Sequence, residues 1–233
     1  MIHCMLGRHE ALLPLAGMLP HRATLFDMPG HGRSPDWEGQ GDFQAATCAM
    51  AEGLAAPASH VIGHSFGATV ALRLACTRPD LVSRLTLIEP VFFAAVRGTA
   101  AFDAHQRDFA PFVRAMQAGD RIAAARAFIN IWGQGGWDDL SPRAQTYIAD
   151  RIHLVPAGAP AIEEDNFGLL GSGLIEALTI PVTLIAGAKS PPVIAAVHAA
   201  LAARMPQARR ITIPEAGHMV PLTHPDAVFD AMN

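Results

Sequence analysis

Two patterns of hydrophobic and polar positions alternate along the chain. Short apolar runs are typical of buried strands, and longer segments with apolar residues every three or four positions are typical of amphipathic helices. We expect strands at 1–4, 23–27, 59–64, 84–89, 181–187 and 208–214, with helices at 9–19, 42–55, 66–78 and 192–204. This alternation predicts an α/β fold in which a mainly parallel sheet of about six strands is flanked by helices.

Residues 94–175 interrupt the alternation. The segments 102–119, 120–132 and 141–154 carry helical patterns, and no convincing strand lies among them. Helices inserted between two strands of a sheet are expected to lie over one edge as a lid. The sequence therefore predicts a core formed by residues 1–93 and 176–233, with a helical cap at 94–175.

Composition and charge narrow the class of protein. The chain has 233 residues, of which 51% are hydrophobic, enough to bury a full core. Its net charge of −4 gives no basic surplus for nucleic acid or a membrane surface. Neither a long apolar run nor a signal-peptide pattern is present, so we expect a cytoplasmic protein. Cys4, Cys48 and Cys76 lack metal-ligand spacing, and we expect neither a metal nor a cofactor.

A Gly-x-Ser-x-Gly motif at 63–67 stands between an expected strand and an expected helix. Glycines on both sides allow a strained turn that pushes the hydroxyl of Ser65 out of the sheet. The helix that follows directs its free N–H groups toward the same place, where they favour developing negative charge. Ser65 is therefore the candidate nucleophile, and the neighbouring His64 is expected to be a packing residue.

A serine hydroxyl needs a base within hydrogen-bond reach. His218 follows the last expected strand, in a Gly-His loop at the carboxyl end of the sheet, where sites of open parallel sheets form. The order of serine first and histidine last fits this arrangement. His224 is expected to open the final helix, with Pro225 at its first position.

The chain resembles the α/β-hydrolase fold family over nearly its whole length. Beside the motifs around Ser65 and His218, the resemblance is carried by IHCMLG at 2–7, DMPGHGRSP at 27–35 and LIEPVFF at 87–93. It implies that the backbone N–H groups of Met5 and Phe66 form an oxyanion hole, in which losing one donor typically costs about 3 kcal/mol of transition-state stabilisation.

Two features depart from the family pattern. Cys4 stands where the family has a glycine, which narrows the hole or changes the backbone path. The chain also starts at the first expected strand, with no sequence for the family's N-terminal hairpin. One sheet edge is therefore expected to be less protected, and pairing of that edge in a homodimer is one remedy.

The third member of the triad departs most from the family. Ser190 stands where an Asp is usual, and a neutral hydroxyl cannot balance the charge of an imidazolium ion. Glu89, at the end of the strand after the nucleophile helix, is the favoured acid, although an acid before a proline also serves as a loop cap. The cap carboxylates Glu163, Glu164 and Asp165 are the reserve candidates, whereas Asp27 and Asp36 are expected to be structural.

The sequence says less about the substrate. Phe92, Trp132 and Trp137 are the candidate residues for an apolar pocket over Ser65, which suits an uncharged or weakly polar acyl group. We expect a serine hydrolase that cleaves a carboxylic ester, lactone or thioester through an acyl-serine intermediate. A carbon–carbon bond hydrolase or a perhydrolase uses the same residues. The alternative is a receptor-like homologue that binds a small molecule with little turnover, as Cys4 and the missing Asp indicate.

Overall fold

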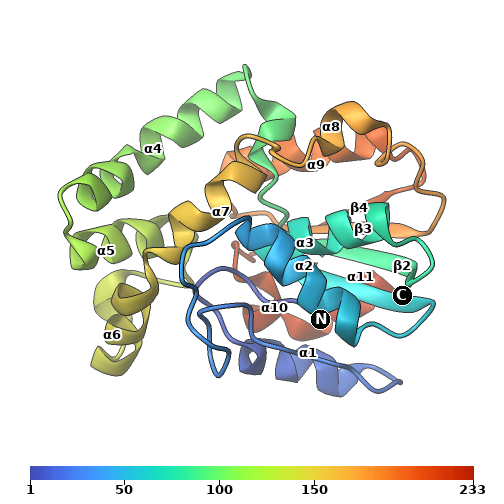
Figure 1. Ribbon diagram of the computed structural model, residues 1–233, viewed down its shortest axis with the longest axis horizontal. Coiled ribbons are helices and arrows are strands. Elements are labelled where there is room, and N and C mark those ends of the chain that lie inside the picture. The colour runs from blue at the N-terminus through green and yellow to red at the C-terminus, as the bar shows by residue number, and fades with distance from the viewer.

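A four-stranded parallel sheet forms the centre of the computed structural model, which describes residues 1–233. Its strands are β1 (Ser59–His64), β2 (Val82–Ile88), β3 (Val182–Gly187) and β4 (Arg209–Ile213), and they lie side by side in that order. Because all strands are parallel, their carboxyl ends meet at one edge of the sheet. The α/β class and the flanking helices are as the sequence predicts (Figure 1).

Only four of the six predicted strands form as strands. Residues 1–4 and 23–27 contribute single bridges instead, in which Ile2 pairs with Gly63 and with Phe26. Strand pairing ends there because the ring of His3 bonds to the backbone of Met28, and Cys4 begins a tight turn. The sheet therefore continues beyond β1 as single bridges, and pairing of this edge in a homodimer stays a prediction.

Alternating residues of the strands separate two hydrophobic cores. Val61, Leu85 and Leu184 face the larger core, which is covered by α2 (Phe43–Leu54), α3 (Phe66–Thr77) and α9 (Pro192–Arg204). Ile62, Ile88 and Ile185 face the smaller core under α1 (Leu13–Met18), α10 (Val220–Thr223) and α11 (Pro225–Met232). Both faces are buried, which explains why these strands read as continuous apolar runs.

The segment between β2 and β3 is helical, without a strand. It contains α4 (Ala100–Gln117), α5 (Arg121–Trp132), α6 (Pro142–Arg151), α7 (Leu154–Ile162) and α8 (Leu169–Ser172), with short 3₁₀ turns at Phe93–Val96 and Trp137–Asp139. Helices α4 to α7 lie beyond one end of the sheet (Figure 1). A third hydrophobic cluster joins them to Leu6 of the first loop. None of the helices is both long and apolar enough to span a bilayer.

The region of the predicted cap is divided between two hydrophobic clusters. Phe93 and Val96 near its start, and Leu169 and Ile175 near its end, belong to the main core. The separate cluster is formed from α4, α5 and α6 with their connections. The boundaries at 94 and 175 stay a prediction, and the helices that lie clear of the sheet are α4 to α7.

Candidate active site

Ser65 occupies the sharp turn between β1 and α3. Its backbone has φ 57° and ψ −117°, which is strained for a residue with a side chain. A Cβ atom at Gly63 would overlap the backbone of Gly67, and one at Gly67 would overlap the carbonyl oxygens of Ile2 and His3. Both glycines are therefore required because the strand, the helix and the first segment approach one another without side chains between them.

The loop after β4 brings His218 to this serine. Nε2 of His218 lies 2.9 Å from Ser65 Oγ. The ring of His64 holds the loop, with Nε2 at 2.9 Å from the carbonyl oxygen of His218. Burial lowers the pKa of His64 to about 3, so its ring is neutral. His224 is the residue before α11 and Pro225 is the first residue of that helix, as predicted.

Glu89 reaches His218 from the end of the neighbouring strand. Its Oε2 lies 2.9 Å from His218 Nδ1, and the residue is fully buried. The other oxygen, Oε1, accepts hydrogen bonds from the N–H of Gly187 at 2.5 Å and from the hydroxyl of Ser190 at 2.7 Å. Like Ser65, Glu89 has a positive φ, 54°, in the left-handed region that residues with a side chain rarely adopt.

Of the other candidate acids, Glu163 lines a cavity that Ser65 also borders, and Asp165 and Asp27 bond to backbone N–H groups. The carboxylate of Asp165 accepts hydrogen bonds from the N–H groups of Leu169 and Leu170 and so caps α8. Asp27 organises the loop at 27–35, where its carboxylate accepts from the N–H groups of His9 and Arg33. The structure therefore brings together Ser65, His218 and Glu89, and of the carboxylates considered only Glu89 bonds to the His218 ring.

Backbone N–H groups are available beside Ser65. Phe66 is the first residue of the 12-residue helix α3, so its N–H has no carbonyl partner within the helix. Met5 lies in a turn in which Gly7 donates to the carbonyl of Cys4 and Leu6 donates to a ring nitrogen of His31. The N–H of Met5 has no acceptor within the protein.

Two neutral histidines hold this turn, a role that the sequence motifs did not predict. His3 Nε2 accepts from the N–H of Met28 at 3.0 Å, and His31 Nε2 accepts from the N–H of Leu6 at 2.9 Å. Burial lowers the pKa of His3 to about 4 and that of His31 to about 3, which keeps both acceptors unprotonated. His3 adjoins Cys4 and His31 lies in DMPGHGRSP, so both were within the motifs that carry the resemblance.

Cys4 lies next to this site without being a second nucleophile. Its side chain is buried and lines the cavity that also contains Ser65 and His218. Burial raises the pKa of its thiol to about 12, so the thiolate does not form near neutral pH. Cys4 therefore contributes shape to the cavity wall.

Two cavities meet at Ser65. The first, about 390 Å³, is bordered by His218, Cys4 and the glycine-rich loop 133–136. The second, about 280 Å³, is bordered by aromatic rings and methyl groups from α4, α5 and α7. Ser65, Met5, Phe128 and Trp132 border both cavities.

Of the three predicted pocket residues, only Trp132 lines a cavity at the site. Its ring lies edge-on to His218, with centroids 4.6 Å apart. The prediction is wrong for Phe92, which points into the main core, and for Trp137, which packs into the cap cluster. Phe93 lines the aromatic cavity instead, together with His105, whose ring packs against it at 4.3 Å between centroids.

One group of side chains has the composition of a metal site. Ligand atoms of His9, Glu10 and Asp27 lie within 4.8 Å of one another. The Asp27 oxygens already accept from the backbone of His9 and Arg33 and contact the ring of His9. The group thus has a structural role in the 27–35 loop.

Comparison with known proteins agrees with this geometry. The sequence model described as the alpha/beta hydrolase family matches residues 1–231. The chain belongs to this family. It is 31% identical over 225 residues to a pimeloyl-[acyl-carrier protein] methyl ester esterase of Xanthomonas campestris pv. campestris, covering 93% of this chain and 85% of the relative.

Solved structures show the same fold. An alpha/beta hydrolase from Sphaerobacter thermophilus superposes with a TM-score of 0.70 at 22% identity, over 98% of this chain and 88% of the other. A thermophilic esterase from Thermogutta terrifontis superposes with a TM-score of 0.67 at 20% identity, over 99% of this chain and 85% of the other.

Proposed function

We propose that this alpha/beta hydrolase cleaves a carboxylic ester, or a related acyl bond, through an acyl-Ser65 intermediate. The observation that carries the proposal is the buried chain of two 2.9 Å contacts from Ser65 Oγ through the His218 ring to Glu89. The esterase name of the relative that matches most of the chain supports an ester as the substrate. The substrate is a small molecule, or the acyl end of a larger one.

Acylation follows from the positions of these groups. His218 Nε2 takes the proton of Ser65 as Oγ bonds to the carbonyl carbon, and the carbonyl oxygen becomes an oxyanion near the N–H groups of Met5 and Phe66. Glu89 stabilises the imidazolium ion across its 2.9 Å contact with Nδ1. The bond from carbon to the leaving oxygen then breaks, and Nε2 gives its proton to that oxygen.

Deacylation repeats these roles with water. His218 Nε2 takes one proton from a water molecule, whose oxygen bonds to the acyl carbon. The bond from carbon to Oγ breaks, and the proton on Nε2 returns to Ser65. The products are a carboxylic acid and the free enzyme, so the protein ends the cycle unchanged.

A protein that only binds its ligand is less well supported. Cys4 and the missing Asp motivate that alternative, but Cys4 only lines the cavity, and Glu89 contacts His218 and is itself held by Ser190. A binding protein has no need for a strained serine with an imidazole at 2.9 Å. A carbon–carbon bond hydrolase or perhydrolase would use the same residues, and substrate profiling separates them from an esterase.

The proposal is tested by burst kinetics with p-nitrophenyl acetate. We expect a burst of nitrophenol close to the enzyme concentration or a steady hydrolysis, together with labelling of Ser65 by a fluorophosphonate. Ser65→Ala should abolish both, whereas Ser83→Ala, which removes an exposed hydroxyl at the amino end of β2, away from the site at the carboxyl end, should leave both unchanged. Hydrolysis at the background rate with no label on Ser65 would overturn the proposal.

A further inference from the structure

The two cavities that meet at Ser65 differ in which catalytic group they touch. His218 borders the cavity with the glycine-rich loop, together with Met219 and Leu222 that follow it. It does not border the aromatic cavity, which Phe66 lines instead. The ring of Trp132, packed edge-on against His218, forms a wall of both cavities.

This difference between the cavities indicates which of them holds the leaving group and which holds the acyl chain. During acyl transfer the leaving oxygen must receive its proton from His218, so the leaving group has to lie on the histidine side of Ser65. The carbonyl oxygen points to the N–H groups of Met5 and Phe66. The remaining substituent on the carbon, the acyl chain, then faces the aromatic cavity.

We propose that the aromatic cavity binds an uncharged acyl chain and that the glycine-loop cavity binds the leaving alcohol. The inference rests on the proposed function and adds the substrate class to it. We call the cavity lined by Phe93, Phe109, Phe112 and Val155 the acyl cavity, and the one lined by residues 133–136 the alcohol cavity.

The acyl cavity has walls suited to hydrocarbon. Phe93, Phe109 and Phe112 line it, and neither lysine nor arginine does. The polar His105 in its wall is buried, and its Nε2 has no hydrogen-bond partner. Glu163 is the one carboxyl group among the lining residues, so an acyl chain that ends in a second carboxylate meets like charge there. The cavity volume of about 280 Å³ suits a short or medium alkyl or aryl chain.

The alcohol cavity has a different wall. Gly133, Gly135 and Gly136 contribute backbone without side chains, and the cavity volume is about 390 Å³. Side chains such as Ile129, Leu140 and Leu222 line the rest of the cavity. At the three glycines no side chain occupies the space beside the backbone, so the loop side of the cavity leaves room for leaving groups of different shape. We therefore expect selectivity for the acyl half of the substrate and tolerance toward the alcohol half.

The test varies one half of the ester at a time. With p-nitrophenol as the constant leaving group, kcat/KM should rise about fourfold per added methylene from acetate onward, until the acyl cavity is full. Adipic acid mono-p-nitrophenyl ester should react at least ~10-fold more slowly than the hexanoate, because Glu163 faces its free carboxylate. A faster reaction of the adipate would overturn the assignment of an uncharged chain.

Two matched variants separate the cavities. Val155 on α7 lines only the acyl cavity, and Ile129 on α5 lines only the alcohol cavity. Val155→Phe should lower kcat/KM for p-nitrophenyl octanoate at least ~10-fold relative to the acetate, because the larger ring fills the space of the chain. Ile129→Phe should leave that ratio unchanged and should lower the rate for 1-naphthyl acetate relative to methyl acetate.

The reverse pattern, with Ile129→Phe changing acyl-length preference and Val155→Phe changing alcohol preference, would overturn the assignment. Should a phenylalanine variant fail to fold, Val155→Ala and Ile129→Ala test the same relation by enlarging each cavity. Val155→Ala should then extend the preferred acyl length, and an unchanged length profile would count against the assignment. Fluorophosphonate labelling of Ser65 reports the proposed function separately, because it requires no acyl chain.

Discussion

Ser190 Oγ donates a 2.7 Å hydrogen bond to Glu89 Oε1, while the other oxygen of the same carboxylate lies 2.9 Å from His218 Nδ1. The N–H of Gly187 donates to Oε1 as well. Two donors at the end of β3 thus fix the direction of an acid that stands at the end of β2. The position where a triad Asp was expected supplies a hydroxyl that orients the acid on the neighbouring strand.

This relationship predicts that Glu89→Gln slows the labelling of Ser65 more than Ser190→Ala does. Glu89→Gln should slow fluorophosphonate labelling of Ser65 at least ~10²-fold, because an amide cannot balance the imidazolium charge. Ser190→Ala should slow it about 10-fold, because the carboxylate remains but loses one of its donors. The measurement is the second-order labelling rate of each variant. A slower rate for Ser190→Ala than for Glu89→Gln would assign the essential role to the hydroxyl.

Gly67→Ala should damage both the fold and the site. A Cβ atom there overlaps the carbonyl oxygens of Ile2 and His3, so the nucleophile turn and the turn that carries Met5 must separate. We expect a loss of roughly 1–3 kcal/mol or more in the free energy of unfolding, and labelling at least ~10-fold slower. Gly53→Ala is the matched control.

Gly53 lies in α2 with no atom within 4 Å of an added Cβ. Its replacement should raise the free energy of unfolding by about 0.5–1 kcal/mol and leave labelling unchanged, because alanine favours the helix. Urea unfolding and labelling of both variants check the pair. Equal stability changes at the two positions would contradict the close approach described for Gly67.

His105→Phe should stabilise the protein, and more so at low pH. Burial lowers the pKa of His105 to about 4, so below the ordinary histidine pKa of 6.5 the unfolded chain binds a proton that the folded protein does not. Stability is therefore complete above pH 6.5 and is lost as pH falls toward 4, by about 1.4 kcal/mol per pH unit.

Phenylalanine cannot bind that proton and removes the unpaired Nε2. Urea unfolding should show a gain of roughly 1 kcal/mol at pH 7.5 and about 2 kcal/mol more at pH 5. The difference between the two pH values is the decisive quantity, because packing changes from the new ring contribute equally at both. The same gain at pH 5 and pH 7.5 would refute a neutral, buried His105.

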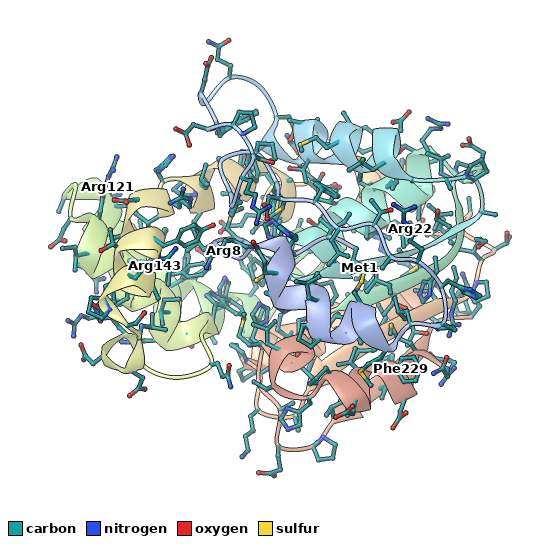
Figure 2. All side chains as sticks on the ribbon, turned by 90° about the horizontal axis from the view of Figure 1, so that it is seen from below. Met1, Arg8, Arg22, Arg121, Arg143 and Phe229 are labelled. Carbon is teal, nitrogen blue, oxygen red and sulfur yellow. The ribbon has the colours of Figure 1, made fainter.

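Tyr147 on α6 joins the cap helices to two loops of the core. Its hydroxyl donates to the carbonyl of Gly7 at 3.2 Å and accepts from the N–H of Gly32 at 3.1 Å. The guanidinium groups of Arg8 and Arg151 lie 4.7 and 4.1 Å from the centre of its ring. Figure 2 shows Arg8 on the side of the molecule where the first loop meets α6.

Tyr147→Phe keeps the ring but leaves the N–H of Gly32 without this partner. We expect a loss of about 1–3 kcal/mol in the free energy of unfolding, and slower labelling because Gly7 ends the turn that contains Met5. Thr146→Ala is the control, since that exposed hydroxyl bonds only within its own helix, and it should change stability by less than ~0.5 kcal/mol. Equal stability of the two variants would show that the hydrogen bonds of the Tyr147 hydroxyl to Gly7 and Gly32 do not stabilise the protein.

The central strands and the three catalytic residues could be predicted from the sequence. Short patterns of apolar residues and glycines determine the strands and the turn at Ser65 locally. The predicted strand 59–64 coincides with β1, and the predicted helix 192–204 coincides with α9. Ser65 stands in a turn that only its flanking glycines permit. The assignment of Glu89 used the resemblance to family members with an acid at the end of this strand, and the absence of a rival acid after the later strand. It is physically consistent because neighbouring parallel strands end at the same edge.

The walls of the site were not readable in the same way. Phe92 and Phe93 are adjacent and chemically identical, and the direction of the short 3₁₀ turn decides that Phe93 faces the cavity. Trp137 was expected at the pocket, but the packing of α5 against α6 buries it in the cap cluster. Likewise, the strands expected at 1–4 and 23–27 shrink to single bridges because the ring of His3 bonds to a backbone N–H of residue 28. Each outcome depends on contacts between segments far apart in sequence.

Because His218 borders only one of the two cavities, its position also determines the order in which the alcohol leaves and water enters the site. Once the alcohol has gone, we expect the incoming water in the space that it vacated, because of the two cavities at Ser65 only this one borders His218. The acyl group stays bonded to Ser65 in the acyl cavity until that water has reacted. A small alcohol in the medium would compete with water for the alcohol cavity. Its attack on the acyl-serine would form a new ester, so the protein would catalyse transesterification.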